Sequence, residues 1–286
     1  MPYPSHQALR LSVACVLGSI FLCHAPQCAA QAKPNPMDAS AEQIAGTISG
    51  AKLSKVIVFD FSGPDKKITQ LGHDFAAEFR RTLAKVATNF QVEDAQEVDD
   101  ALAKISYAPE IVLYPESQLA AAQELHASGF VIGQVSTNGN KLTLDVSAYR
   151  AKDGKGLRSM QMSWTLTDDL RALVEKKIEY PDFDDGGGPV AGPNDKHYTT
   201  PKCLFCPRAD FSEEAAAHNI EGVAEFVVVV GEDGRVTNVR IIRPLPYGLT
   251  AKAMEAIRRW KLSPALGPDG KPARVRQLIE VTFRHF

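Results

Sequence analysis

The chain has 286 residues, of which 44% are hydrophobic, and this is enough apolar material for about two folded domains. Basic and acidic residues nearly balance, and the formal net charge is -2. This balance gives no reason to expect nucleic-acid binding or a membrane-coating surface, since both depend on an excess of positive charge.

The first 30 residues have the pattern of an export signal. Arg10 precedes a short apolar run at residues 11–23, and the small residues Cys28 and Ala30 flank a cleavage point. The run is shorter than the roughly 20 residues that a membrane-spanning helix needs. We therefore expect residues 1–30 to be a cleavable signal peptide, with an uncleaved membrane anchor as the alternative.

The next part of the sequence predicts an α/β domain over residues 53–179. Residues 31–52, rich in Ala, Pro, Ser and Gln, are interpreted as a flexible leader to it. A buried strand at residues 55–61 precedes an amphipathic helix, and Asn138-Gly139 marks a tight hairpin turn. The expected order is strand, helix, strand, two helices, three strands and a helix.

Residues 180–202 have the composition of a flexible linker. They carry three consecutive glycines and four prolines, without any apolar period. The order of elements changes after this segment, so we place a domain boundary here.

Residues 203–286 predict a smaller domain with the order helix, strand, strand, helix, strand. We expect Asp210 to cap its first helix and Thr250 its second. In the last strand Val275 and every second residue after it form the core face, while the residues between them are mostly polar. The fold class is therefore α+β, with an N-terminal α/β domain and a C-terminal domain built on a small antiparallel sheet.

Removal of the signal would leave two cysteines, Cys203 and Cys206. An oxidising compartment favours a disulfide between them. Two alternatives stay open. His197 and His218 could complete a zinc site with both cysteines, or the pair could act in thiol redox chemistry, although no strand precedes it as in thioredoxin-like folds.

We expect no enzymatic activity and no cofactor. The sequence contains no Gly-x-Ser-x-Gly, His-Glu-x-x-His or Walker motif. His73 and His126 lie far from any catalytic partner in sequence and are interpreted as structural residues.

The C-terminal domain combines several distinctive features, which are Gly222, Asp233-Gly234, a Val-x-x-Val-x-Ile spacing, Gly248-Leu249, the segment AIRRWKLSPA and a following Gly-Lys-Pro. In these features it resembles the C-terminal domain of the TonB family. One departure is Phe211-Ser212, which stands where the family has Tyr-Pro, while Ala215 is retained. Residues 53–179 are also similar, in element order alone, to the small α/β domain that begins periplasmic TolB-like proteins.

The TonB resemblance implies a periplasmic protein that binds protein partners. Family members couple an inner-membrane proton motor to outer-membrane transporters, and the last strand of the domain pairs with a short transporter segment. Strand addition of this kind uses the unpaired backbone groups of a sheet edge. The resemblance assigns that edge to Gln277, Leu278, Ile279, Glu280, Val281, Thr282, Phe283 and Arg284.

Two departures argue against force transmission by pulling. The N-terminus resembles a cleavable signal rather than an anchor, and an extended linker over 180–202 reaches only about 80 Å at ~3.3 Å per residue. A soluble periplasmic adaptor with a protein partner fits equally well, in contact with membranes only through that partner. A homodimer and a redox- or zinc-dependent module remain as alternatives.

Overall fold

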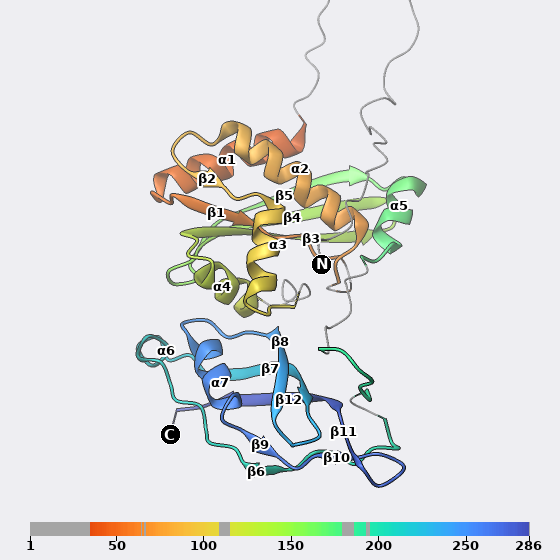
Figure 1. The fold of residues 1–286 in the computed structure, drawn as a ribbon. Helices are drawn as coiled ribbons and strands as arrows, with labels where there is room; N and C mark the ends of the chain where they lie inside the picture. The colour runs from red at the N-terminus through yellow and green to blue at the C-terminus, as the bar shows by residue number, and fades with distance from the viewer. Residues whose placement is uncertain are drawn as a thin grey trace, which may run out of the picture. The chain divides into compact units, whose positions relative to one another are not determined.

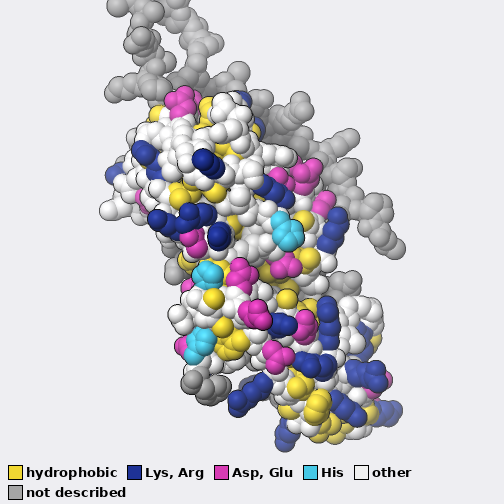
Figure 2. Space-filling view, turned by 90° about the vertical axis from the view of Figure 1, so that its left-hand side faces the viewer, with side chains coloured by type: hydrophobic (Ala, Val, Ile, Leu, Met, Phe, Trp, Pro, Cys, Tyr) yellow, Lys and Arg dark blue, Asp and Glu magenta, His cyan; other side chains and the backbone are white. Residues whose placement is uncertain are grey.

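The computed structural model describes residues 35–63, 65, 67–108, 115–178, 186–192 and 195–285. The expected signal peptide at residues 1–30 lies outside these residues. Within the described ranges, no helix combines the length and hydrophobicity that a membrane crossing requires. Charged side chains of both signs are spread over the face in Figure 2, in keeping with the near-zero net charge.

A five-stranded sheet forms the centre of the N-terminal part of the structure (Figure 1). The strand order is β2-β1-β3-β4-β5. Strand β1 pairs in parallel with β2 and β3, whereas β3, β4 and β5 pair antiparallel. The strands are β1 (Lys55–Val58), β2 (Gln91–Val92), β3 (Gly129–Asn138), β4 (Lys141–Arg150) and β5 (Gly156–Thr165).

Helices cover both faces of this sheet, with α1 and α2 on one side and α3 and α4 on the other (Figure 1). From β1 onward the order of elements is the one predicted from the sequence. The hairpin between β3 and β4 turns at Gly139, which has a φ of +56°. The helices are α1 (Pro36–Gly50), α2 (Gln70–Val86), α3 (Ala95–Lys104), α4 (Pro115–Glu124) and α5 (Asp168–Glu175).

Helix α1 corrects the interpretation of residues 31–52 as a flexible leader. The side chain of Asn35 accepts a hydrogen bond from the N–H of Met37, and Pro36 occupies the first helical turn, where its missing N–H costs nothing. Ile44 and Ile48 are buried with Met37 against α2 and β5. The N-terminal domain therefore includes residues before position 53.

The C-terminal part contains a three-stranded antiparallel sheet in the order β12-β7-β8. Helix α7 packs against one face, onto Phe226, Val228 and Val230, whose side chains are fully buried. Two short pairs, β6 with β9 and β10 with β11, flank the sheet. The elements are β6 (Cys203–Phe205), α6 (Glu213–Ala217), β7 (Gly222–Val230), β8 (Val236–Arg243), α7 (Leu249–Ile257), β9 (Lys261–Leu262), β10 (Ala265–Leu266), β11 (Pro272–Ala273) and β12 (Val275–Phe283).

Both helix caps predicted for this domain are wrong. Ser212, rather than Asp210, caps α6, because its hydroxyl accepts from the N–H of Ala215. Gly248, with a φ of +75°, precedes α7, while Thr250 lies inside the helix. The hydroxyl of Thr250 instead bonds to both backbone groups of Leu245, which fastens the approach to the helix.

The N-terminal part pairs directly with the outer edge of β8. The N–H of Ile241 donates to the carbonyl of Ser106 at 2.7 Å, and the N–H of Ala108 donates to the carbonyl of Ile241 at 2.8 Å. Nearby, the N–H of Tyr247 donates to the side chain of Gln123. Residues 106–108 therefore satisfy backbone groups that an edge strand would otherwise leave open.

The carboxylate of Asp60, which follows β1, forms a hydrogen bond with His73 of α2. Nδ1 of His73 lies 2.7 Å from Oδ2 of Asp60, and Arg80 lies 3.7 Å from the other carboxylate oxygen. The hydrogen bond to Asp60 raises the pKa of His73 above its usual 6.5, although burial acts in the opposite direction. The structure thus supplies a local partner that explains a structural role for His73.

Replacement of Gly133 by alanine should destabilise the fold by about 1 to 3 kcal/mol. An added Cβ would lie 2.5 Å from ring carbons of Phe61, which is fully buried. Gly46→Ala is the control, because that site in α1 is open, and it should stabilise by up to about 1 kcal/mol. Urea unfolding measures both, and equal effects would contradict the packing described here.

Asp60→Asn should lower the pKa of His73 towards 6.5, as measured by NMR titration of the imidazole. In the unsubstituted protein the protonated His73 stabilises the fold fully below pH 6.5, and this contribution is lost as the pH rises through the raised pKa. The variant should lack that part of the pH dependence. An unchanged His73 titration would rule out Asp60 as the cause.

Candidate functional site

Strand β12 lies at the edge of the C-terminal sheet and pairs along its whole length with β7. The register runs from Val275 opposite Val230 to Phe283 opposite Gly222. Ile279, Val281 and Phe283 are buried in the core, as the alternation in the sequence predicts. The side chains of the strand therefore anchor it firmly while one backbone edge faces away from β7.

The hydrogen bonds of Ala191 identify which residues turn their backbone groups outward. The N–H of Arg276 donates to the carbonyl of Ala191 at 2.9 Å, and the N–H of Ala191 donates to the carbonyl of Arg274 at 3.1 Å. Backbone direction alternates along an antiparallel strand. Leu278, Glu280 and Thr282 therefore also point their N–H and C=O groups away from β7.

This alternation divides the eight predicted edge residues into two classes. The odd-numbered ones direct their backbone groups to β7, and the even-numbered ones within the strand form the edge. The side-chain amide of Gln277 donates to the carbonyl of Leu278 at 3.0 Å, so that acceptor already has a partner. Arg284 follows the last residue of β12.

The side chains beside this edge combine apolar and acidic character. Leu278 is 45% exposed, which is unusual for a large aliphatic residue, and Glu280 and Thr282 are also exposed. Glu280 lies opposite Glu225 in the register, and Glu225 is 3.4 Å from Arg243. An added strand would thus meet one apolar side chain and one acidic one in alternation.

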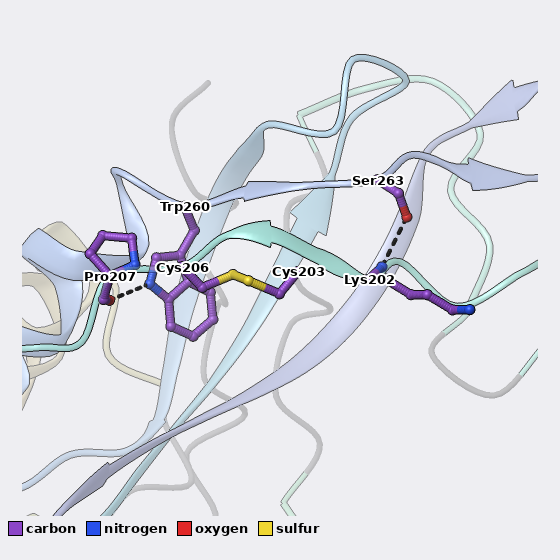
Figure 3. Close-up of a disulfide and its surroundings, with 6 residues drawn as sticks. All are labelled: Lys202, Cys203, Cys206, Pro207, Trp260 and Ser263. Atoms are coloured by element: carbon purple, nitrogen blue, oxygen red, sulfur yellow. Dashed lines mark hydrogen bonds between the residues drawn. A yellow bond between two sulfur atoms is a disulfide. The ribbon is translucent and has the colours of Figure 1, made fainter.

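A disulfide joins Cys203 and Cys206 at the entry to the C-terminal domain, with the two Cα atoms 6.0 Å apart (Figure 3). The enclosed residues belong to β6, which pairs antiparallel with β9. The indole N–H of Trp260 donates to the carbonyl of Pro207 at 3.0 Å, and the N–H of Lys202 donates to the hydroxyl of Ser263. Hydrogen bonds thus fasten the chain on both sides of the disulfide.

The structure does not assemble the four ligands of the alternative zinc site. Both sulfurs are used in the disulfide. His197 lies 2.9 Å from Asp195, and the ring of His218 stacks on Tyr247 at 4.2 Å between centroids. Across the described ranges, no three His, Cys, Asp or Glu side chains are grouped in a way that could hold a metal ion.

Sequence reasoning missed the contacts of the segment interpreted as a flexible linker over 180–202. Ala191 pairs with the start of β12, and Thr199 exchanges hydrogen bonds with Leu266 through its backbone and its hydroxyl. Backbone pairing of this kind leaves no pattern of residue types, so the composition of the segment could not reveal it.

Comparison with known proteins supports the C-terminal assignment. Residues 207–285 match the family model of the Gram-negative bacterial TonB protein C-terminal. No curated protein matches the chain.

Three solved structures are among those similar to parts of this chain. The LpoB C-terminal domain from Salmonella enterica is 15% identical, with a TM-score of 0.38, and the alignment covers 45% of this chain and 95% of that one. The TonB C-terminal domain from Pseudomonas aeruginosa is 18% identical, with a TM-score of 0.26, over 35% and 99%. TolB from Acinetobacter baumannii is 9% identical, with a TM-score of 0.25, over 80% and 38%. The resemblance of the C-terminal domain to that of TonB, expected from the sequence, is confirmed by the family match over residues 207–285.

Proposed function

We propose that this chain is a periplasmic protein that binds a partner protein by strand addition at β12. The observation that carries the proposal is the open stretch of the outer edge of β12. Among the described residues, only Ala191 pairs with this edge through its backbone, at the start of the strand, and the outward backbone groups beyond that bridge have no strand beside them. The edge from Leu278 to Thr282 is therefore where a further strand would bind.

The backbone of this edge supplies the main attraction. The N–H groups of Leu278, Glu280 and Thr282 point outward, and each hydrogen bond to an added strand contributes about 1 kcal/mol net. Because the core side chains hold β12 in place, the strand itself loses little conformational entropy on binding. The side chains then select the partner: Leu278 favours an apolar residue, and Glu280 favours a basic or hydroxyl-bearing one.

The proposed location and partner class rest on separate observations. The export pattern of residues 1–30 and the joined cysteines fit an oxidising compartment outside the cytoplasm. The family match of residues 207–285 supports a link to outer-membrane transport, with a short transporter segment as the added strand. Binding by strand addition requires no cofactor.

Glu280→Pro should weaken partner binding by more than about fivefold, since proline removes an outward N–H at a position where an edge strand tolerates it. The matched control Glu280→Ala removes the side chain and keeps the N–H, and it should bind within about threefold of the unsubstituted protein. Fluorescence anisotropy with peptides from the periplasmic N-terminal segments of outer-membrane transporters measures both.

Two results would count against strand addition. One is the absence of binding to any such peptide, and the other is equal binding by the proline and alanine variants. Circular dichroism melting must show that both variants remain folded. A dimer that is lost only in Glu280→Pro, detected by light scattering, would instead identify a second copy of this chain as the added strand.

We further propose that the disulfide acts as a clip that fixes how the chain enters the C-terminal domain. Replacement of Cys203 and Cys206 by serine should destabilise the domain by about 2 kcal/mol, the loop-closure entropy of so short a loop. The fluorescence of Trp260 should shift to the red, because its contact with Pro207 follows the disulfide directly.

Reductant and thiol titration complete this test. The reductant should lower the melting temperature of the unsubstituted protein and leave the double serine variant unchanged. Thiol titration of protein isolated from the periplasm should detect no free thiol. Stoichiometric zinc or two reactive thiols would overturn the clip and restore the zinc or redox alternative.

A further inference from the structure

A second exposed surface lies on β6 and the segment paired with it. We define the β6 surface as residues 199–208 and 258–266, which run antiparallel through pairs such as Cys203 with Leu262. It displays Leu204, Phe205 and Leu266, exposed by 63%, 61% and 40%. A group of exposed apolar side chains, unlike a single one, often marks a contact site for a protein or a membrane.

The β6 surface is also strongly basic. Its two segments contain five Lys or Arg residues and no Asp or Glu; they are Lys202, Arg208, Arg258, Arg259 and Lys261. The chain as a whole carries a net charge of -2, so this concentration is local. Figure 2 shows hydrophobic side chains at the lower end of the molecule, at the height of β6 and β9 in Figure 1, among many Lys and Arg side chains.

The turn beside this surface carries an acidic residue that is already paired. The backbone of Arg235 forms an isolated β-bridge with Lys261, and the guanidinium of Arg235 lies 3.5 Å from the carboxylate of Asp233. Lys202 and Lys261 are exposed, and neither forms an ion pair with another residue in the described part of the chain. In Figure 3 the side chain of Lys202 extends away from the disulfide.

The apolar residues are held outward by the local covalent and backbone structure. The disulfide closes a loop whose two inner residues are Leu204 and Phe205. On the opposite strand Leu262 is buried, and its N–H donates to the carbonyl of Gly234 at 2.9 Å. An added Cβ at Gly234 would lie 1.9 Å from the carbonyl oxygen of Leu262, so the turn between β7 and β8 packs closely on β9.

We propose that the β6 surface binds an anionic lipid bilayer, with Leu204 and Phe205 inserted at the headgroup boundary and the basic side chains on the phosphates. An apolar tip among several Lys and Arg residues provides the two signals that reversible membrane binding needs. This surface is separate from the β12 edge, and the proposal stands independently of strand addition.

The test uses the mature protein with its disulfide intact and vesicles of phosphatidylethanolamine with phosphatidylglycerol. Sedimentation should show binding that is weakened by salt, and vesicles of phosphatidylcholine alone should bind far less. Leu204→Ser with Phe205→Ser should reduce binding by about tenfold or more. Lys202→Gln with Lys261→Gln should also reduce it by about tenfold.

Leu278→Ser is the matched control, because it removes an exposed leucine from the β12 edge, and it should leave vesicle binding unchanged. Melting temperatures must show that every variant is folded. The proposal is overturned if anionic vesicles are not bound, or if the Leu204 and Phe205 variant binds them normally. Loss of transporter-peptide binding in that variant, without any vesicle binding, would identify the surface as a protein contact instead.

Discussion

The backbone groups at the two outer edges of a three-stranded sheet have no partner within the sheet, and in the C-terminal sheet a distant segment pairs with a short part of each edge. Strand β7 is paired on both sides, by β12 and β8. Residues 106–108 of the N-terminal part pair with the outer edge of β8 at Ile241, and Ala191 pairs with the outer edge of β12 at its start. The binding role proposed for β12 depends on the stretch of its edge beyond that bridge, because the outward backbone groups there can pair with a further strand.

The N-terminal part contacts the C-terminal domain that carries the proposed site, although none of the site residues comes from the N-terminal part. The loop that carries Ser106 and Ala108 follows α3. The N–H of Tyr247, just before α7, donates a hydrogen bond to the side chain of Gln123 in α4. Helix α1, in turn, packs against α2 and β5. The stability of the N-terminal sheet would thus support the pairing at the outer edge of β8.

The two proposed surfaces of the C-terminal domain differ in chemistry. The β12 edge offers directional backbone hydrogen bonds with one apolar and one acidic side chain, which suits an extended peptide. The β6 surface offers exposed apolar side chains and an excess of positive charge, which suits the surface of an anionic lipid bilayer. A domain that uses both could contact a membrane and a transporter segment at the same time.

The sequence alone determined features that depend on differences between side chains. The alternation from Val275 to Phe283 predicted the core face of β12, and the spacing of apolar residues predicted α2. The sequence did not reveal α1, because Met37, Ile44 and Ile48 stand among small and polar residues. Their burial depends on contacts with α2 and β5, which are distant in sequence. The cap prediction at Asp210 was wrong, because Ser212 lies nearer to the N–H that needs a partner.

Only the tertiary structure decided where each outer edge is paired and which residues of β12 turn outward. Side chains differ along the chain, and so their order records which face of a strand is buried. Backbone N–H and C=O groups are the same at nearly every residue, and so no sequence pattern could indicate that residues 106–108 pair with Ile241 or that Ala191 pairs with β12. Those pairings follow from the packing of distant segments, which places identical groups within reach of each other.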